Sequence, residues 1–155
     1  VADAATGIVM NNRLLGFSTD PAHPNAPGAR KRPAHTLNPA MVIRDGRLRF
    51  LMGTPGGSGQ TLTLTQVLTH CIDDGLGLAD AITAPRWSMD LKGNALVEPE
   101  AERGIIESLA GLGIAARDAG TQRSFFGSAE CIAFEADGTL VAAADFRRDA
   151  HASAA

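Results

Sequence analysis

The sequence predicts an α+β fold in which a mainly antiparallel sheet is covered by helices. Strand-like and helix-like segments come in blocks rather than in strict strand–helix–strand alternation, which favours this class over a doubly wound sheet. Two Asp-Gly pairs, at 45–46 and 137–138, each separate two strand-like runs and so predict hairpins. The chain of 155 residues, 45% of them hydrophobic, is long enough to bury one core.

In the first third of the chain, residues Thr6 to Asn12 are apolar and end at an Asn pair, so we expect a short buried strand. The segment from Ser18 to Pro39 is rich in Pro, His, Asn and Gly and predicts a long loop. A loop of this length in a compact domain is usually functional or contacts another subunit. The first hairpin follows, with strands Met41 to Arg44 and Arg47 to Met52.

A glycine-rich loop then leads into a helix, whose apolar residues fall at helical spacing: Leu64, Val67, Leu68, Cys71 and Ile72. Gly75 is a typical helix stop. A shorter helix over Leu78 to Thr83 ends before Pro85. Residues 86–98 then predict a strand, a Gly-Asn turn and a second strand, with Trp87 packed beside Arg86.

The last third predicts a helix over Glu100 to Leu112, stopped by Gly113, and the second hairpin. We assign residues 1–150 to one domain and residues 151–155 to a frayed tail, because the polar, Ala-rich run from Arg147 onward has no periodicity. The chain opens at Val1 without Met or a signal segment, so we expect an internal cut in a longer chain.

Composition argues against several classes of function. The net charge is −3 and the basic residues form no stripe, so nucleic acid is not expected as a partner. The apolar stretches are far shorter than the ~20 residues of a membrane span. Cys71 and Cys131 lie in apolar runs without metal-binding spacing, so we expect buried free thiols and no metal site.

The glycine loop, Gly53 to Thr61, is the most informative local motif. It is similar to a phosphate-binding loop, but Gln60 takes the place of the lysine that would neutralise phosphate charge. Alternatively, the amides of Gly56 and Gly57 could face a developing oxyanion in acyl transfer. A tight connection without function is equally compatible with these residues. The loop alone leaves the three readings open.

Candidate ligand contacts lie just after the expected first strand and within the proline-rich loop: Arg13, Arg32, His35 and Thr36. Each could equally be a solvated residue or, for His35, a hydrogen-bonded structural histidine. No Ser-His-Asp arrangement or nucleophile elbow is present in the sequence.

Five segments, in order, resemble the small subunit of gamma-glutamyltranspeptidases and related acylases: GIVMNN, KRPAHTLNPAMVIRDG, GTPGGSGQT, QVLTHCIDDGLGLADAITAPRW and GSAECIAFEADGTLVAAADFRR. The resemblance implies a four-layer αββα sandwich of N-terminal-nucleophile hydrolases, to which this chain supplies part. It implies a proenzyme that cleaves itself and exposes an N-terminal threonine, which attacks an amide with its own α-amino group as base. That threonine is expected upstream of Val1.

The resemblance also implies the partners and the site. The partners are the large subunit, the N-terminal piece of the small subunit and a small-molecule amide substrate, with neither metal nor organic cofactor. Gly56 and Gly57 correspond to the oxyanion-hole glycines, and Asn12, Arg13, His35 and Thr36 to substrate-binding positions. The cellular compartment, periplasmic or cytoplasmic, stays open.

Two departures from the transpeptidase pattern concern the acyl group. The segment NNRLLGF has Gly16 where transpeptidases hold the substrate α-ammonium with an acidic residue, and Arg13 where Gln or Glu is usual. His35 and Thr36 replace a serine pair that receives the α-carboxylate. An α-ammonium is disfavoured beside Arg13, so we expect a glutaryl- or oxamate-like acyl group. The alternatives are a true gamma-glutamyltransferase or glutathione hydrolase, and a non-catalytic or nucleotide-binding module.

Overall fold

The structure is a computed structural model that describes residues 2–90, 92–101 and 104–153. It divides the chain into two compact units, Val1–Thr36 and Leu37–Ala155. Among the described residues, the larger unit contains two sheets and the α-helices.

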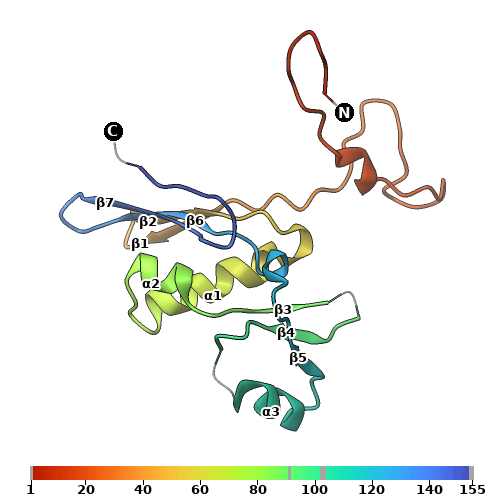
Figure 1. The fold of residues 1–155 in the computed structure, drawn as a ribbon. Helices are drawn as coiled ribbons and strands as arrows, with labels where there is room; N and C mark the ends of the chain where they lie inside the picture. Colours follow the sequence, from red (N-terminus) through yellow and green to blue (C-terminus); the bar gives the residue numbers. More distant parts are fainter. Residues whose placement is uncertain (1, 91, 102–103, 154–155) are drawn as a thin grey trace. The chain divides into compact units, whose positions relative to one another are not determined.

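The main sheet of the larger unit has four antiparallel strands in the order β1-β2-β6-β7. Figure 1 shows helices α1 and α2 on one side of this sheet. The bounds are β1 (Ala40–Arg44), β2 (Arg47–Gly53), β6 (Glu130–Phe134), β7 (Leu140–Ala144), α1 (Gln60–Ile72) and α2 (Leu78–Thr83). Both predicted hairpins and both predicted helices are therefore confirmed.

The turn of the first hairpin follows from its two residues. Asp45 and Gly46 both have positive φ angles, 52° and 72°, as a two-residue turn that matches strand twist requires. The core lies between the sheet and the two helices, where Met52, Val67 and Ile82 are at most 4% exposed. The helical spacing of the apolar residues on α1 thus predicted the buried face, although Ile72 at its end is 49% exposed.

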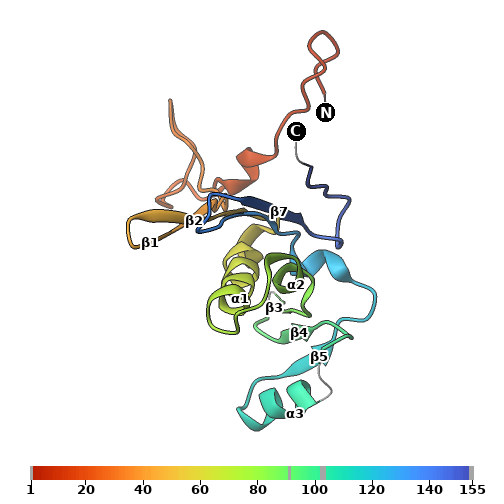
Figure 2. The same ribbon diagram turned by 90° about the vertical axis from the view of Figure 1, so that its left-hand side faces the viewer.

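A second, three-stranded sheet has the order β3-β4-β5, with β3 (Trp87–Met89), β4 (Ala95–Val97) and β5 (Ala116–Asp118). Strands β3 and β4 pair antiparallel as predicted, whereas β4 and β5 pair in parallel across the connection that contains α3 (Gly104–Gly111). Figure 2 shows α1 and α2 between the two sheets, and α3 beyond the smaller one. The helix begins later than the predicted Glu100, and residues 102–103 lie outside the described residues.

The predicted strand over Thr6 to Asn12 is wrong. In the smaller unit this segment forms only an isolated bridge between Ala2 and Val9, and Ile8, Val9 and Met10 are 56–75% exposed. A strand needs a neighbouring strand to bond its N–H and C=O groups, and apolar character alone does not supply one. The short helix η1 (Arg13–Gly16) follows, and the proline-rich loop contains no helix or strand before β1, as predicted.

Arg147 opens the polar run on which the frayed tail was predicted, yet its side chain is buried and only 1% exposed. Residues 151–153, the described part of the predicted frayed tail, are exposed and without regular structure. None of the helices in the described ranges is long and apolar enough to span a membrane. Within the same ranges, no cluster of His, Cys, Asp or Glu side chains has the makings of a metal site.

The two thiols provide a first test of the core. Burial raises the pKa of Cys131 to about 12, and burial also raises the pKa of Cys71. We expect native Cys131 to resist alkylation by iodoacetamide at pH 8, because the reactive thiolate is scarcely populated there. Mass spectrometry of the alkylated protein, native against denatured, measures this. Equal labelling of Cys131 in both states would contradict its burial.

Candidate active site

The glycine loop places two adjacent backbone donors at the start of α1. Gly56 and Gly57 have φ angles of 149° and 57°, both in the region that favours glycine. The Gly56 carbonyl accepts a hydrogen bond of 2.9 Å from the Gly59 N–H, which starts the short helix η2 (Gly57–Gly59). Neither the Gly56 N–H nor the Gly57 N–H donates to any of the described residues. Two exposed donors are thus left for a ligand.

A glycine turn from another part of the chain packs against this loop. It follows η3 (Arg123–Phe126) and leads into β6. The Ser128 N–H donates to Oγ1 of Thr54 at 3.0 Å, and the Thr63 hydroxyl donates to the Phe126 carbonyl at 3.1 Å. Thr54 lies in the glycine loop and Thr63 lies in α1, so these two bonds link residues 126–128 to the loop and to the helix.

Gly127 is required at the centre of this turn. Its φ is 73°, and a Cβ atom there would lie 2.6 Å from Oγ1 of Thr54 and 2.8 Å from Oγ1 of Thr63. Those distances are too short for any side chain unless the two threonine hydroxyls, or the segments that carry them, move. The contact therefore couples the position of residues 126–128 to that of the loop that carries Gly56 and Gly57.

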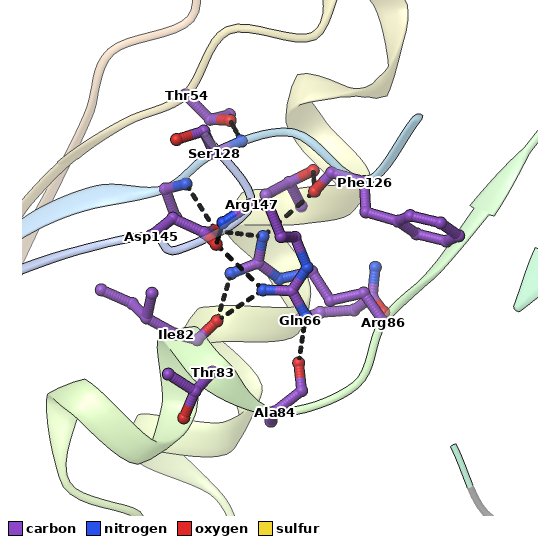
Figure 3. A network of polar contacts seen from close by, with 12 residues as sticks. Thr54, Gln66, Ile82, Thr83, Ala84, Arg86, Phe126, Ser128, Asp145 and Arg147 are labelled. Carbon is purple, nitrogen blue, oxygen red and sulfur yellow. Dashed lines mark hydrogen bonds and ion pairs between the residues drawn. The ribbon is translucent and has the colours of Figure 1, made fainter. Parts of the chain in front are cut away.

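Beneath the turn lies a buried ion network made of Arg86, Glu98, Asp145 and Arg147. Figure 3 shows three of its members, Arg86, Asp145 and Arg147. The four side chains are at most 1% exposed. Nη1 of Arg86 lies 2.6 Å from Oδ2 of Asp145, and Nη1 of Arg147 lies 3.1 Å from Oδ1 of the same carboxylate. Arg147 also bonds Glu98 through Nε, at 2.7 Å, and through Nη2. Two positive and two negative groups balance, as buried charges require.

The buried ion network holds both ends of the glycine turn. Nη1 of Arg86 donates to the Phe126 carbonyl at 3.0 Å, just before Gly127. The Ala129 N–H donates to Oδ2 of Asp145 at 2.9 Å, just after Ser128. Figure 3 shows the Arg86 and Arg147 side chains beside Asp145, with bonds to the carbonyls of Ile82, Ala84 and Phe126. The four charged residues are therefore positioning residues for the turn and, through it, for the glycine loop.

The electrostatics keep Asp145 ionised. Burial alone would raise the pKa of this carboxyl, but the hydrogen bond from the Ala129 N–H and the positive charge of Arg86 bring it below its usual value. Burial lowers the pKa of Arg147, whereas the bonds to Glu98 and Asp145 raise it. The net effect is an increase. Both shifts favour the charged forms of Asp145 and Arg147.

Sequence reasoning missed the buried ion network. An isolated arginine is usually solvated, and Arg147 falls in a run without periodicity. The available signal was the presence of charged residues directly beside short apolar strands, as with Glu98 after β4 and Asp145 after β7. Such a residue is either solvated at a strand end or paired inside, and only the tertiary contacts distinguish the two.

The predicted substrate-binding residues lie in the smaller unit. Asn12 and Arg13 are at the start of η1, and His35 and Thr36 are at the other end of the unit. The side chain of Asn25 donates to the Gly16 carbonyl and accepts from the Ala34 N–H at 3.2 Å, so it links the two segments. The roles of these four residues toward Gly56 and Gly57 stay predictions.

Gly16 approaches the second segment very closely. A Cβ atom at position 16 would lie 2.2 Å from the Ala34 carbonyl oxygen. A backbone atom cannot be displaced as cheaply as the end of a side chain, so this packing admits only glycine. Glycine at position 16, a departure from the transpeptidase pattern, is therefore required sterically in the smaller unit.

The phosphate-binding reading of the glycine loop finds no support in the larger unit. Gln60, at the position where such a loop has lysine, is 5% exposed, and its Oε1 accepts the Asn38 N–H at 3.0 Å. The side chain thus faces the protein and carries no charge. Gly56 and Gly57 instead line a cleft of about 980 Å³.

The family model for gamma-glutamyltranspeptidase matches residues 1–155. This chain belongs to the gamma-glutamyltranspeptidase family. The glutathione hydrolase-like YwrD proenzyme of Bacillus subtilis is 46% identical over 82 residues, which cover 53% of this chain and 16% of that protein. The oxamate amidohydrolase proenzyme of Klebsiella pneumoniae is 45% identical over 83 residues, with the same coverage of 53% and 16%.

The fold is that of solved members of the family. The crystal structure of cephalosporin acylase from Bacillus halodurans has a TM-score of 0.84 and 32% identity over 93% of this chain and 27% of that chain. The predicted α+β fold of N-terminal-nucleophile hydrolases, to which this chain supplies part, is thereby confirmed. The matched region spans only about a sixth to a quarter of these relatives' length.

Proposed function

We propose that this chain supplies the oxyanion hole of an autoprocessed amide hydrolase or acyltransferase. The observation that carries the proposal is the pair of adjacent N–H groups at Gly56 and Gly57, which donate to none of the described residues and line a cleft. Donors fixed in advance toward a developing negative charge stabilise a transition state by about 3 kcal/mol each. The relatives are named as hydrolases, amidohydrolases and acylases. Two of them are named as proenzymes, which agrees with autoprocessing.

In the proposed reaction, the hydroxyl oxygen of an N-terminal threonine adds to the carbonyl carbon of the substrate amide, and its proton goes to the threonine's own α-amino group. The carbonyl oxygen becomes negative and accepts hydrogen bonds from Gly56 and Gly57. The C–N bond then breaks, and the amine leaves with the proton. Water, or an acceptor amine, attacks the resulting ester and restores the threonine.

The nucleophile is proposed to come from another segment of the enzyme. The hydroxyls of Thr54 in the glycine loop and of Thr63 in α1 are both engaged. Thr54 donates to the Pro55 carbonyl at 2.8 Å and accepts from Ser128, and Thr63 donates to the Phe126 carbonyl. Neither has the free α-amino group that this chemistry uses as its base.

The acyl group that we propose lacks an α-ammonium and ends in a carboxylate, as in glutaryl and oxamate amides. Two features support this choice. The close approach of Gly16 to Ala34 leaves no room for an acidic side chain that would hold an ammonium group. Arg13 lies in the same helical turn, η1, and offers a positive charge with a planar fork suited to a carboxylate. His35 and Thr36 would add hydrogen bonds to the same carboxylate.

Substrate profiling of the processed enzyme tests this acyl preference. We expect glutaryl-4-nitroanilide to be hydrolysed with a kcat/KM at least about tenfold above that of the gamma-glutamyl anilide, because Arg13 attracts the carboxylate and repels the ammonium. Arg13→Gln should remove most of this difference, because it should raise KM for the glutaryl substrate. Release of 4-nitroaniline is followed by absorbance.

The matched control is Arg47→Gln, which removes the same charge from the exposed hairpin end in the larger unit. It should leave both anilides unaffected. A wild-type preference for the gamma-glutamyl anilide would favour the second candidate, a glutathione hydrolase. The name of the 46% identical relative, glutathione hydrolase-like, is the observation that supports that alternative.

The large subunit is the proposed partner, and the face of the main sheet opposite α1 and α2 is the proposed contact. Met41, Leu51, Ile132 and Ala142 are directly paired across the four strands. Met41 and Ile132 are 62% and 38% exposed. A cross-strand apolar row on a sheet face opposite its helices is suited to packing against a second sheet, as in a four-layer sandwich.

A further inference from the structure

The cleft beside Gly56 and Gly57 is strongly cationic. Three positive side chains line it from separate elements: Lys92 in the β3–β4 turn, Arg117 in β5 and Arg148 after β7. In the described part of the chain, none of the three forms an ion pair with a carboxylate. Three elements distant in sequence thus bring unpaired positive charge to the wall that holds the two free amides.

Among the residues that the structure describes, one acidic side chain, Asp90, lines the cleft, and it is occupied by hydrogen bonds. Asp90 accepts hydrogen bonds from the N–H groups of Lys92 and Asn94, at 2.8 and 2.9 Å, and from the Asn94 side chain at 2.9 Å. These bonds lower the pKa of Asp90, and those from Asn94 have the largest effect. The positive charge of Arg117 has a smaller effect in the same direction. The carboxylate therefore organises the β3–β4 turn and leaves the excess of positive charge in the cleft.

The same cleft has an apolar part. Met89 and Phe125 line it, and their side chains are 46% and 48% exposed. An exposed aromatic ring and a thioether offer contact to the flat or apolar body of a small molecule. The cations stand beside this surface, so the cleft combines recognition of an apolar body with recognition of an anionic group.

We propose that this cleft binds the amine half of the substrate, and that it selects amines that carry a carboxylate on an apolar or aromatic body. This inference rests on the proposed function, because it places the scissile carbonyl at Gly56 and Gly57. The acyl half then extends away from the cleft, and the departing amine lies against Met89 and Phe125, with its carboxylate toward Lys92, Arg117 and Arg148. The same cleft would receive an acceptor amine of that class.

Two anilides that differ in a single carboxylate test the proposal on the processed enzyme. They are the 4-nitroanilide and the 3-carboxy-4-nitroanilide of whichever acyl group, glutaryl or gamma-glutamyl, the enzyme hydrolyses faster. We expect a lower KM for the carboxylated anilide, by about threefold to tenfold, since exposed charge pairs contribute modestly. High salt should reduce the difference.

The variants separate the cleft from general effects of charge. Arg148→Gln and Lys92→Gln should each raise KM for the carboxylated anilide by about threefold, and the double variant by about tenfold, with the plain anilide unchanged. Arg47→Gln is the matched control and should change neither. Equal KM values for the two anilides in the wild type, or variants that raise both equally, would overturn the assignment.

Binding of the amines alone separates failure of this proposal from failure of the proposed function. The products of the two reactions are 5-amino-2-nitrobenzoate and 4-nitroaniline, and calorimetry can compare their affinities. If neither anilide is hydrolysed, the proposed function is wrong, but tighter binding of the aminobenzoate that is lost in the double variant still supports the cleft. Equal and unaltered affinities would refute it.

Discussion

Asp145→Ala is expected to destabilise the processed enzyme by about 3–5 kcal/mol, because it leaves two buried guanidinium groups without their shared carboxylate. Arg86 and Arg147 both bond this side chain, which is fully buried. The Ala129 N–H also loses its acceptor. Denaturant unfolding, with the midpoint and slope compared between variant and wild type, measures the change.

Asp149→Ala is the matched control, since this exposed carboxylate lies four residues further along the same segment. Its substitution should change stability by less than about 0.5 kcal/mol. A shift of similar size in both variants would show that the buried ion network contributes nothing specific. Asp145→Asn supplies a second comparison, since it keeps the volume and removes the charge.

The same carboxylate predicts a dependence on pH. The pKa of Asp145 is lower in the folded protein than its usual value of 3.8. The unfolded chain therefore takes up this proton first as the pH falls, so the contribution of Asp145 is complete above that value and is lost below it. The stability difference between wild type and Asp145→Asn should shrink as the pH falls from 5 toward 3, which thermal unfolding can follow.

Gly127→Ala is expected to lower kcat by about a hundredfold, the effect of misplacing an oxyanion-hole donor. A methyl group at this position would meet the hydroxyls of Thr54 and Thr63 at 2.6 and 2.8 Å. Relief of that contact requires rotation of the two threonine side chains, with loss of their bonds to Ser128 and Phe126, or a shift of the glycine turn. Steady-state hydrolysis of the preferred anilide measures kcat, and circular dichroism confirms that the variant is folded.

The control for Gly127 is Gly113→Ala. Gly113 has nearly the same φ, 76°, but a Cβ atom there would have nothing within 4 Å. This variant carries the backbone strain, roughly 1 kcal/mol, without the contact. It should retain kcat. If both variants lose activity equally, the loss comes from backbone strain and not from the coupling between the turn and the glycine loop.

Local patterns predicted the elements that local physics determines. The Asp45-Gly46 turn, the apolar spacing on α1 and the stop before Pro85 each depend on a few neighbouring residues, and each was correct. The strand expected over Thr6 to Asn12 depended on a partner strand that local sequence cannot supply. The parallel strand β5 was missed for the same reason, because its pairing with β4 spans a helix.

The candidate site likewise has a part that local sequence predicted and a part that depends on tertiary contacts. The glycine pair was identified from its loop, and the resemblance to a family assigned it a role. The buried ion network was missed because Arg86 and Asp145 meet across 59 positions of sequence. The cationic cleft was missed because its three charges come from elements whose arrangement depends on the whole larger unit. Only the folded chain shows these charges as groups.

The contact between Gly16 and Ala34 has an evolutionary consequence. A lineage that already carries this backbone approach cannot acquire an acidic residue at position 16 by one viable mutation, since even the first carbon of the new side chain would lie 2.2 Å from a carbonyl oxygen. The two loops would have to separate first, with loss of the Asn25 link between them. Ancestral or engineered conversion of acyl specificity should therefore begin with changes at positions 25 and 34, and only then at 16.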